Sequence, residues 1–131
     1  MSQVKVINVI HPSGSTNNIV LDNAGGSKLG GAVSYTAPVT ITGSTYSVGA
    51  TDCWLIANFA GTVTLTLPSA SSYTGRAMTV KTVQAQTVVS ASSNVVPATS
   101  TTAGTAILAA TAGKFATLIS DGTNWIIMQS N

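Results

Sequence analysis

The stretch Gly61-Thr62-Val63-Thr64-Leu65-Thr66-Leu67-Pro68 alternates apolar and hydroxyl-bearing residues with a period of two. Successive side chains of a β-strand point to opposite faces, so Val63, Leu65 and Leu67 share one face and the threonines share the other. The proline ends the pattern because it cannot donate a hydrogen bond to a neighbouring strand. This stretch therefore predicts a half-buried strand with a hydroxyl-coated outer side.

The same period and an abundance of β-branched residues predict further strands along the chain. They cover residues 4–10, 18–21, 39–42, 45–48, 54–59, 77–83, 87–90, 105–109, 115–120 and 125–129. Asp121-Gly122-Thr123-Asn124 predicts a hairpin between the last two, because Asp and Gly tolerate the positive φ of such turns. Residues 98–112 are rich in Ala and Thr, but their β-branched content and Gly104 favour strand and loop over helix. The fold class that follows is all-β, a short-strand β-sandwich or barrel-like module. No repeat of fixed period indicates a solenoid.

Charge is scarce in this chain. Five Lys or Arg and three Asp make up 6% of the 131 residues and give a net charge of +2, whereas a typical soluble domain is about 25% charged. A hydrophobic content of 44% excludes a disordered chain. Five scattered cations do not form the dense row that phosphates require, so no nucleic-acid partner is expected. Either hydroxyl and amide side chains keep a monomer soluble, or much of the surface faces other copies of the chain.

The glycine-rich segment Gly25-Gly26-Ser27-Lys28-Leu29-Gly30-Gly31 suggests a division of the chain. We expect an N-terminal extended β arm over residues 1–24, a flexible joint over 25–31 and an all-β domain over 32–131. Two short strands cannot bury a core alone, so the arm is expected to pair with a neighbouring sheet or pack on a partner. The residues expected to bind that partner are Val4, Val6, Ile7, Val9, Ile10, Ile19, Val20 and Leu21.

The candidates for chemistry are few, and each has a simpler interpretation. The glycine-rich segment lacks the Gly-Lys-Ser/Thr ending and following helix of a phosphate-binding loop. His11 stands before Pro12 in a polar turn, Asp52 is expected to cap a turn through its side chain, and Cys53 enters an apolar strand as a buried, inert thiol. We therefore expect no catalytic residue, no cofactor and no metal site.

The large aromatic residues allow two interpretations. They could line a carbohydrate platform, but in β proteins such residues more often anchor a core or an interface. The set comprises Tyr35, Tyr46, Trp54, Phe59, Tyr73, Phe115 and Trp125. No apolar run approaches 18 residues, so no membrane span is expected. The N-terminus lacks a signal-peptide pattern, so we expect the chain either to fold in a reducing cytoplasm or to be indifferent to the redox compartment.

Two stretches resemble proteins of tailed bacteriophages. The first runs Val4-Lys5-Val6-Ile7-Asn8-Val9-Ile10-His11-Pro12-Ser13-Gly14 and continues to Asp22; it resembles the N-terminal segment of virion structural proteins of phages of cyanobacteria and marine bacteria. The second begins at Asp52, runs through Val63-Thr64-Leu65-Thr66-Leu67-Pro68 to Arg76, and ends with Ser120-Asp121-Gly122-Thr123-Asn124-Trp125-Ile126-Ile127-Met128. It resembles a small β module of phage tail fibres, head fibres and head-decoration proteins.

The resemblance implies a homotrimeric, non-enzymatic virion protein assembled in the host cytoplasm. The short chain favours a capsid decoration (cement) protein that binds the major capsid protein or another virion protein on the outer capsid surface. The alternative is a short tail-fibre or head-fibre protein that binds host-surface glycan. Apolar and Thr-bearing faces can pack across a threefold axis without burying charge. The expected trimer-interface residues are Val63, Leu65, Leu67, Trp125 and Ile127.

Overall fold

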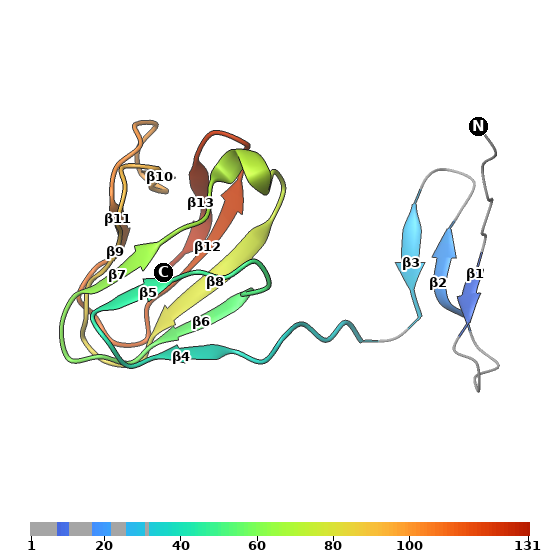
Figure 1. Ribbon diagram of the computed structural model, residues 1–131, viewed down its shortest axis with the longest axis horizontal. Helices are drawn as coiled ribbons and strands as arrows, with labels where there is room; N and C mark the ends of the chain where they lie inside the picture. The colour runs from blue at the N-terminus through green and yellow to red at the C-terminus, as the bar shows by residue number, and fades with distance from the viewer. Residues whose placement is uncertain (1–7, 11–16, 22–25, 31) are drawn as a thin grey trace. The chain divides into compact units, whose positions relative to one another are not determined.

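The computed structural model describes residues 8–10, 17–21, 26–30 and 32–131. The chain divides into two compact units, Met1–Tyr35 and Thr36–Asn131, called here the N-terminal unit and the sandwich unit (Figure 1). The structure is all-β, as the period-two pattern predicts, and the one helical segment in its described part is the short 3-10 turn η1 (Ala70–Ser72).

The N-terminal unit contains a three-stranded antiparallel sheet in the order β1-β2-β3. Its strands are β1 (Asn8–Ile10), β2 (Asn17–Leu21) and β3 (Ser27–Leu29). β1 falls within the predicted strand 4–10, and β2 begins one residue before the predicted strand 18–21. The third differs from the prediction, because it lies inside the segment 25–31 that the sequence presents as a flexible joint. The pairing of Ile19 with Leu29 and of Leu21 with Ser27 gives its backbone groups partners that glycine content alone does not reveal.

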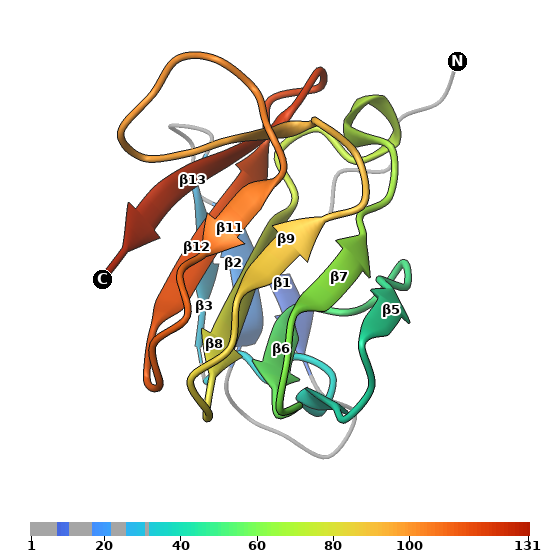
Figure 2. The ribbon, with the colours of Figure 1, turned by 90° about the vertical axis from the view of Figure 1, so that its left-hand side faces the viewer.

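The sandwich unit consists of two mixed sheets packed face to face (Figure 2). The large sheet has six strands in the order β10-β13-β12-β8-β6-β4, and the small sheet has four in the order β11-β9-β7-β5. The strands are β4 (Val39–Ile41), β5 (Thr45–Ser47), β6 (Trp54–Ala57), β7 (Val63–Thr66), β8 (Ala77–Thr82), β9 (Val88–Ser90), β10 (Val95–Val96), β11 (Ala106–Leu108), β12 (Phe115–Ser120) and β13 (Trp125–Ser130).

The first six strands of the sandwich unit alternate between the sheets. β4, β6 and β8 are parallel neighbours in the large sheet, and β5, β7 and β9 are parallel neighbours in the small sheet. The backbone therefore passes back and forth between the two sheets of the sandwich. Val39 is in register with Leu55, and Leu55 with Val80, so one passage through both sheets takes 16 residues and the next 25. These unequal spacings agree with the absence of a fixed sequence period.

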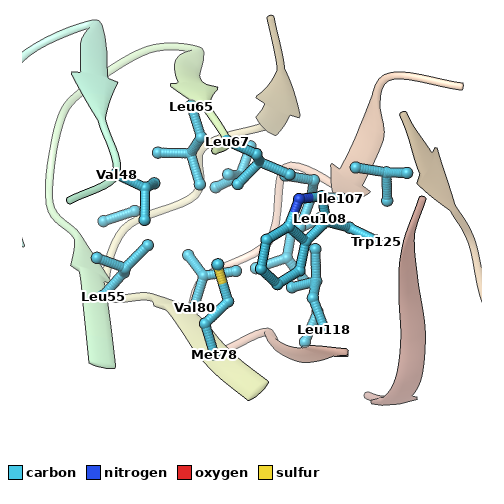
Figure 3. Packing of buried hydrophobic residues seen from close by; sticks show 14 of the residues in the cluster. Val48, Leu55, Leu65, Leu67, Met78, Val80, Ile107, Leu108, Leu118 and Trp125 are labelled. Carbon is cyan, nitrogen blue, oxygen red and sulfur yellow. The ribbon is translucent and has the colours of Figure 1, made fainter. Parts of the chain in front are cut away.

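The core lies between the two sheets (Figure 3). Leu55, Val80 and Leu118 project from the large sheet and Val63 and Leu65 from the small one, each with an exposed fraction of 1% or less. The predicted alternation is confirmed, since Val63, Leu65 and Leu67 point inward while Thr62 and Thr66 are exposed. The inner faces thus use mainly the apolar half of the strand patterns, with Thr82, Ser90 and Ser120 as buried polar exceptions, and the function must be sought on the outer faces and the loops.

Candidate interaction surface

The outer face of the small sheet carries hydroxyl groups on strands β5 and β7, whereas Val89 and Ala106 continue the face on β9 and β11. Thr45 lies opposite Thr64 and Ser47 opposite Thr66 on the neighbouring strands β5 and β7. Three of these residues are exposed and Thr64 is half-buried. Hydroxyls exchange hydrogen bonds with water readily, so this face is well solvated without charge.

The outer face of the large sheet is different, because an uninterrupted row of apolar side chains crosses four of its strands. Val96 is paired with Ile126, Ile126 with Ile119, and Ile119 with Ala77, which places the row across β10, β13, β12 and β8. Their inward-facing sequence neighbours Val95, Trp125, Leu118 and Met78 are buried, whereas the row itself is half-buried or exposed. At a strand spacing of about 4.8 Å this apolar row is about 14 Å long.

Met128 extends the apolar surface beside this row. The register of β12 and β13 shifts between Thr117 and Leu118, so Met128 stands at an irregularity opposite no paired residue. Its side chain is 64% exposed, the largest fraction of any large hydrophobic residue described. A bulge that turns a flexible apolar side chain to solvent is typical of a contact site, not of a core position.

A second row separates the apolar row from the remainder of the large sheet. It runs Trp54–Thr79–Thr117–Gln129 across β6, β8, β12 and β13. The hydroxyls of Thr79 and Thr117 are hydrogen-bonded to each other at 3.1 Å. The two half-buried hydroxyls satisfy one another in this way, which lets polar residues occupy the middle of the face.

The third row places a lysine between apolar neighbours. Thr40, Ile56, Lys81 and Phe115 are in register across β4, β6, β8 and β12, so Lys81 lies between Ile56 and Phe115. A hollow of about 260 Å³ opens here. It is lined by Pro38, Trp54, Leu55, Ile56, Thr79, Lys81 and Phe115.

The described aspartates are engaged away from this surface. Asp52 Oδ2 accepts hydrogen bonds from the Tyr46 hydroxyl at 2.8 Å and from the Gly49 N–H at 2.7 Å. Asp121 Oδ1 accepts from the N–H groups of Asn124 at 2.6 Å and Thr123 at 2.7 Å. These two hydrogen bonds lower the pKa of Asp121 below its ordinary value of 3.8, and the bond from Asn124 has the larger effect. The two carboxylates shape turns, as the sequence predicts for Asp52.

The side chain of Arg76 also stabilises the turn that contains Asp52. Its Nη2 donates to the carbonyl oxygens of Gly49 and Asp52, each at 2.7 Å, and its guanidinium lies 4.9 Å from the centre of the Tyr73 ring. The side chain thus joins the loop before β6 to the turn before β8. Its bonds go to backbone carbonyls, so the interpretation that fits is structural.

The predicted trimer-interface residues require a correction. Val63, Leu65, Leu67, Trp125 and Ile127 are buried between the two sheets of one chain, with exposed fractions of 0 to 8%. The Trp125 indole N–H donates to the Pro68 carbonyl at 2.9 Å, which fixes it inside the core. These side chains already contact the facing sheet, so they cannot form a contact with another copy.

The partner-binding residues predicted in the arm fall partly on described strands. Val9 and Ile10 lie in β1, and Ile19, Val20 and Leu21 lie in β2. Ile19 is half-buried. Val4, Val6, Ile7 and His11 lie outside the described residues.

The aromatic residues separate into two groups. Trp125 is fully buried, and Tyr46, Phe59 and Tyr73 pack against the core. Trp54 is 42% and Tyr35 59% exposed. Phe115 is half-buried and lines the hollow with Trp54.

Cys53 is half-buried, not buried as predicted, and its thiol lies 3.6 Å from the Thr51 carbonyl oxygen.

Sequence reasoning missed the apolar row, although a signal for it was present. Trp125-Ile126-Ile127-Met128 is a continuous apolar run, and such a strand is apolar on both faces. In a two-layer sandwich only one of those faces meets the second sheet, so the other remains on the surface.

Within the described ranges, no three His, Cys, Asp or Glu side chains come together as metal ligands do. The same residues include no helix with the length and apolar content to cross a membrane. Neither the models of known protein families nor the curated proteins searched gave a match to this chain.

Proposed function

We propose that this chain is a non-enzymatic structural protein of a tailed-bacteriophage virion, a homotrimer that decorates the outer capsid surface. The resemblance of its two sequence stretches to phage virion proteins supports the virion role. The observation that carries the proposal is the apolar row Val96–Ile126–Ile119–Ala77, which crosses four strands of one outer face, whereas two strands of the opposite face, β5 and β7, present hydroxyls.

The difference between the two faces is the argument for self-association. Contiguous apolar surface on a soluble protein marks an interaction site, because burying it removes it from water. The row contains no charged group, so a second copy could cover it without the cost of desolvating ions. Three copies that cover their apolar rows and leave the hydroxyl-bearing faces in water would form a closed, soluble assembly.

Measurement of the mass in solution tests the trimer. The wild-type chain is expected at three times its mass of 13.1 kDa. Ile126→Asp and Met128→Asp each place a charge on the proposed interface and are expected to shift the protein to monomers at micromolar concentration. Thr66→Asp is the matched control on the opposite face and should leave the mass unchanged. A wild-type monomer, or trimers that tolerate both interface variants, would contradict the assignment.

The N-terminal unit is proposed as the anchor to the major capsid protein or another virion protein. Its sheet has only three short strands, and a sheet of this size gains stability by adding to another sheet or by packing on a partner. Residues 32–38, which span the boundary between the two units, are all exposed, which suits a connection between an anchor and the sandwich unit.

Co-sedimentation with empty heads of the encoding phage tests this anchor. The full chain is expected to pellet with the heads, and a chain lacking residues 1–35 is expected to stay in the supernatant. Circular dichroism and mass should show that the truncated chain is still a folded trimer, because its core lies within the sandwich unit. Undiminished pelleting of the truncated chain would reject the anchoring role.

A second candidate is a short tail-fibre or head-fibre protein that binds host-surface glycan. The specific observation in its favour is the hollow beside Trp54 and Phe115, since exposed aromatic rings provide the amphipathic surface that sugars contact. Adsorption of the purified protein to host cells would favour the fibre role, whereas binding to heads alone would favour decoration.

A further inference from the structure

The hollow on the third row has the composition of a small ligand site. Its lining is almost entirely apolar and includes the rings of Trp54 and Phe115 and the side chain of Ile56; Lys81, an exposed residue, contributes its apolar stem to the wall and carries its ammonium toward the rim. Binding sites for small molecules typically combine apolar walls with a few polar groups that fix orientation. A volume of about 260 Å³ is just below the range of roughly 300–1,000 Å³ for sites of drug-sized ligands. It therefore suits one ring-sized unit.

Strand register fixes where the cation stands relative to the rings. Phe115 is directly opposite Lys81, and Trp54 is opposite Thr79, two residues before Lys81 on the same strand. Direct neighbours have Cβ atoms about 5 Å apart and diagonal neighbours about 7–8 Å apart. An ammonium group at the end of a four-carbon stem can therefore reach over a ring-sized ligand that rests against either aromatic side chain.

The charge on this surface lacks a complement in the described part of the chain. The two described aspartates accept their hydrogen bonds from Tyr46 and Gly49 and from Thr123 and Asn124. Lys81 is the one charged residue in the three rows of the large sheet. A ligand with an apolar face and one negative group at its edge would therefore complement both the hollow and Lys81.

We propose that the hollow binds the carboxylate-bearing sugar units of an acidic polysaccharide, such as uronic acid residues. The C–H groups on one side of a pyranose ring carry partial positive charge and meet the negative face of an aromatic ring, here Trp54 or Phe115. The carboxylate accepts a charge-assisted hydrogen bond from Lys81. A phosphate would fit less well, since it is usually held by several Arg or backbone N–H groups. This inference rests on the second candidate function, glycan binding, and names its ligand class.

Titration of the ¹⁵N-labelled full chain with uronic acid oligosaccharides tests the inference. The probes are galacturonate and alginate fragments, each compared with the same fragment whose carboxyl groups are reduced to alcohols. The acidic fragments are expected to shift the indole N–H signal of Trp54. Trp125 is an internal control, because its indole N–H is bonded to Pro68 in the core and should not shift.

Two lysine variants separate charge recognition from general attraction to a cationic protein. Lys81→Met keeps most of the stem but removes the ammonium, and it should weaken binding of the acidic fragments about tenfold, with little effect on the reduced ones. Lys114→Met removes a lysine that does not line the hollow and should leave the affinity unchanged.

The possible results distinguish the inference from the function on which it rests. Equal binding of acidic and reduced fragments at Trp54, or acidic binding that survives Lys81→Met, would overturn the proposed ligand class but retain glycan binding. Absence of any shift at Trp54 with every fragment would overturn both. A selective shift by the acidic fragments that is lost in Lys81→Met supports both.

Discussion

Single residues hold the loops of this protein in place, and Tyr46 is the clearest case. Its hydroxyl donates to Asp52 Oδ2 at 2.8 Å, and the same oxygen accepts from the Gly49 N–H. The hydrogen bond to Asp52, then burial and the negative charge of Asp52, raise the pKa of Tyr46 above its ordinary value of 10.0. The hydroxyl of Tyr46 therefore holds its proton more tightly in the folded chain than in the unfolded one.

The raised pKa of Tyr46 leads to a prediction about alkaline stability. A raised folded-state pKa contributes stability that is fully present below pH 10.0, the unfolded value, and is lost as the pH rises through the folded-state pKa. Tyr46→Phe removes the hydroxyl and should cost about 1 kcal/mol of unfolding free energy at pH 7. It should also make the unfolding free energy fall less steeply as the pH rises into the alkaline range. Urea unfolding between pH 7 and 11 measures both effects.

Thr45→Ser is the control for this prediction, because Thr45 directly precedes Tyr46 on β5 and its side chain is exposed and does not titrate. It should change neither the free energy at pH 7 nor its alkaline slope by more than a few tenths of a kcal/mol. If Tyr46→Phe left the alkaline slope as steep as in the wild type, the hydrogen bond to Asp52 would not account for it.

At the scale of elements, the β12–β13 hairpin follows closely from its sequence. β12 spans the predicted residues, and the turn Asp121-Gly122-Thr123-Asn124 lies where expected. The positive φ belongs to Gly122 alone, at +94°, whereas Asp121 contributes through its side-chain hydrogen bonds. A Cβ at position 122 would also lie 2.9 Å from the Thr74 hydroxyl oxygen. Glycine is therefore required here for two reasons.

Replacement of this glycine should destabilise the hairpin and with it the fold. Gly122→Ala introduces an unfavourable backbone conformation and a close contact, and we expect a loss of about 1–3 kcal/mol of unfolding free energy. Gly104→Ala is the control, since a Cβ there meets nothing within 4 Å and its φ is not in the left-handed region. Urea denaturation compares the two variants. Equal stability of Gly122→Ala and Gly104→Ala would contradict the requirement for glycine.

The sequence does not determine which strands pair with each other or which element covers the apolar face of a strand, and the reason is physical. A period-two pattern tells which residues share a face, but not which other element covers that face. The pattern alone therefore predicts a trimer interface for Val63 and Leu65, although the facing sheet of the same chain buries them. The parallel pairing of β4, β6 and β8 depends on contacts between residues far apart in sequence. Local propensity does not encode such contacts, whereas the hairpin turn is encoded by adjacent residues.

At the scale of the whole molecule, the two outer faces of the sandwich unit explain how a chain with 6% charged residues can function. On the small sheet, the exposed Thr and Ser side chains of β5 and β7 offer hydroxyls that can hydrogen-bond with water. The face of the large sheet combines an apolar row, proposed as the contact between copies, with a hollow next to Lys81, proposed as a ligand site. Ile119 and Phe115 are four residues apart on β12, about 13 Å along an extended strand. The two sites can therefore be occupied together.

An increase in salt concentration should weaken ligand binding at the hollow but not the association of the copies. Electrostatic attraction is screened over about 3 Å in 1 M salt, so the binding of acidic fragments next to Lys81 should weaken steeply between 50 mM and 1 M NaCl. The apolar row contains no charge, and each chain carries a net +2, so salt removes only a weak repulsion between copies. The dissociation constant of the trimer should therefore stay within about threefold or decrease, and sulfate should decrease it further. Analytical ultracentrifugation and ligand titration over the same salt series measure the two responses. Dissociation of the trimer at 1 M NaCl would show that charged contacts hold the copies together, and the interface would then have to be placed away from the apolar row.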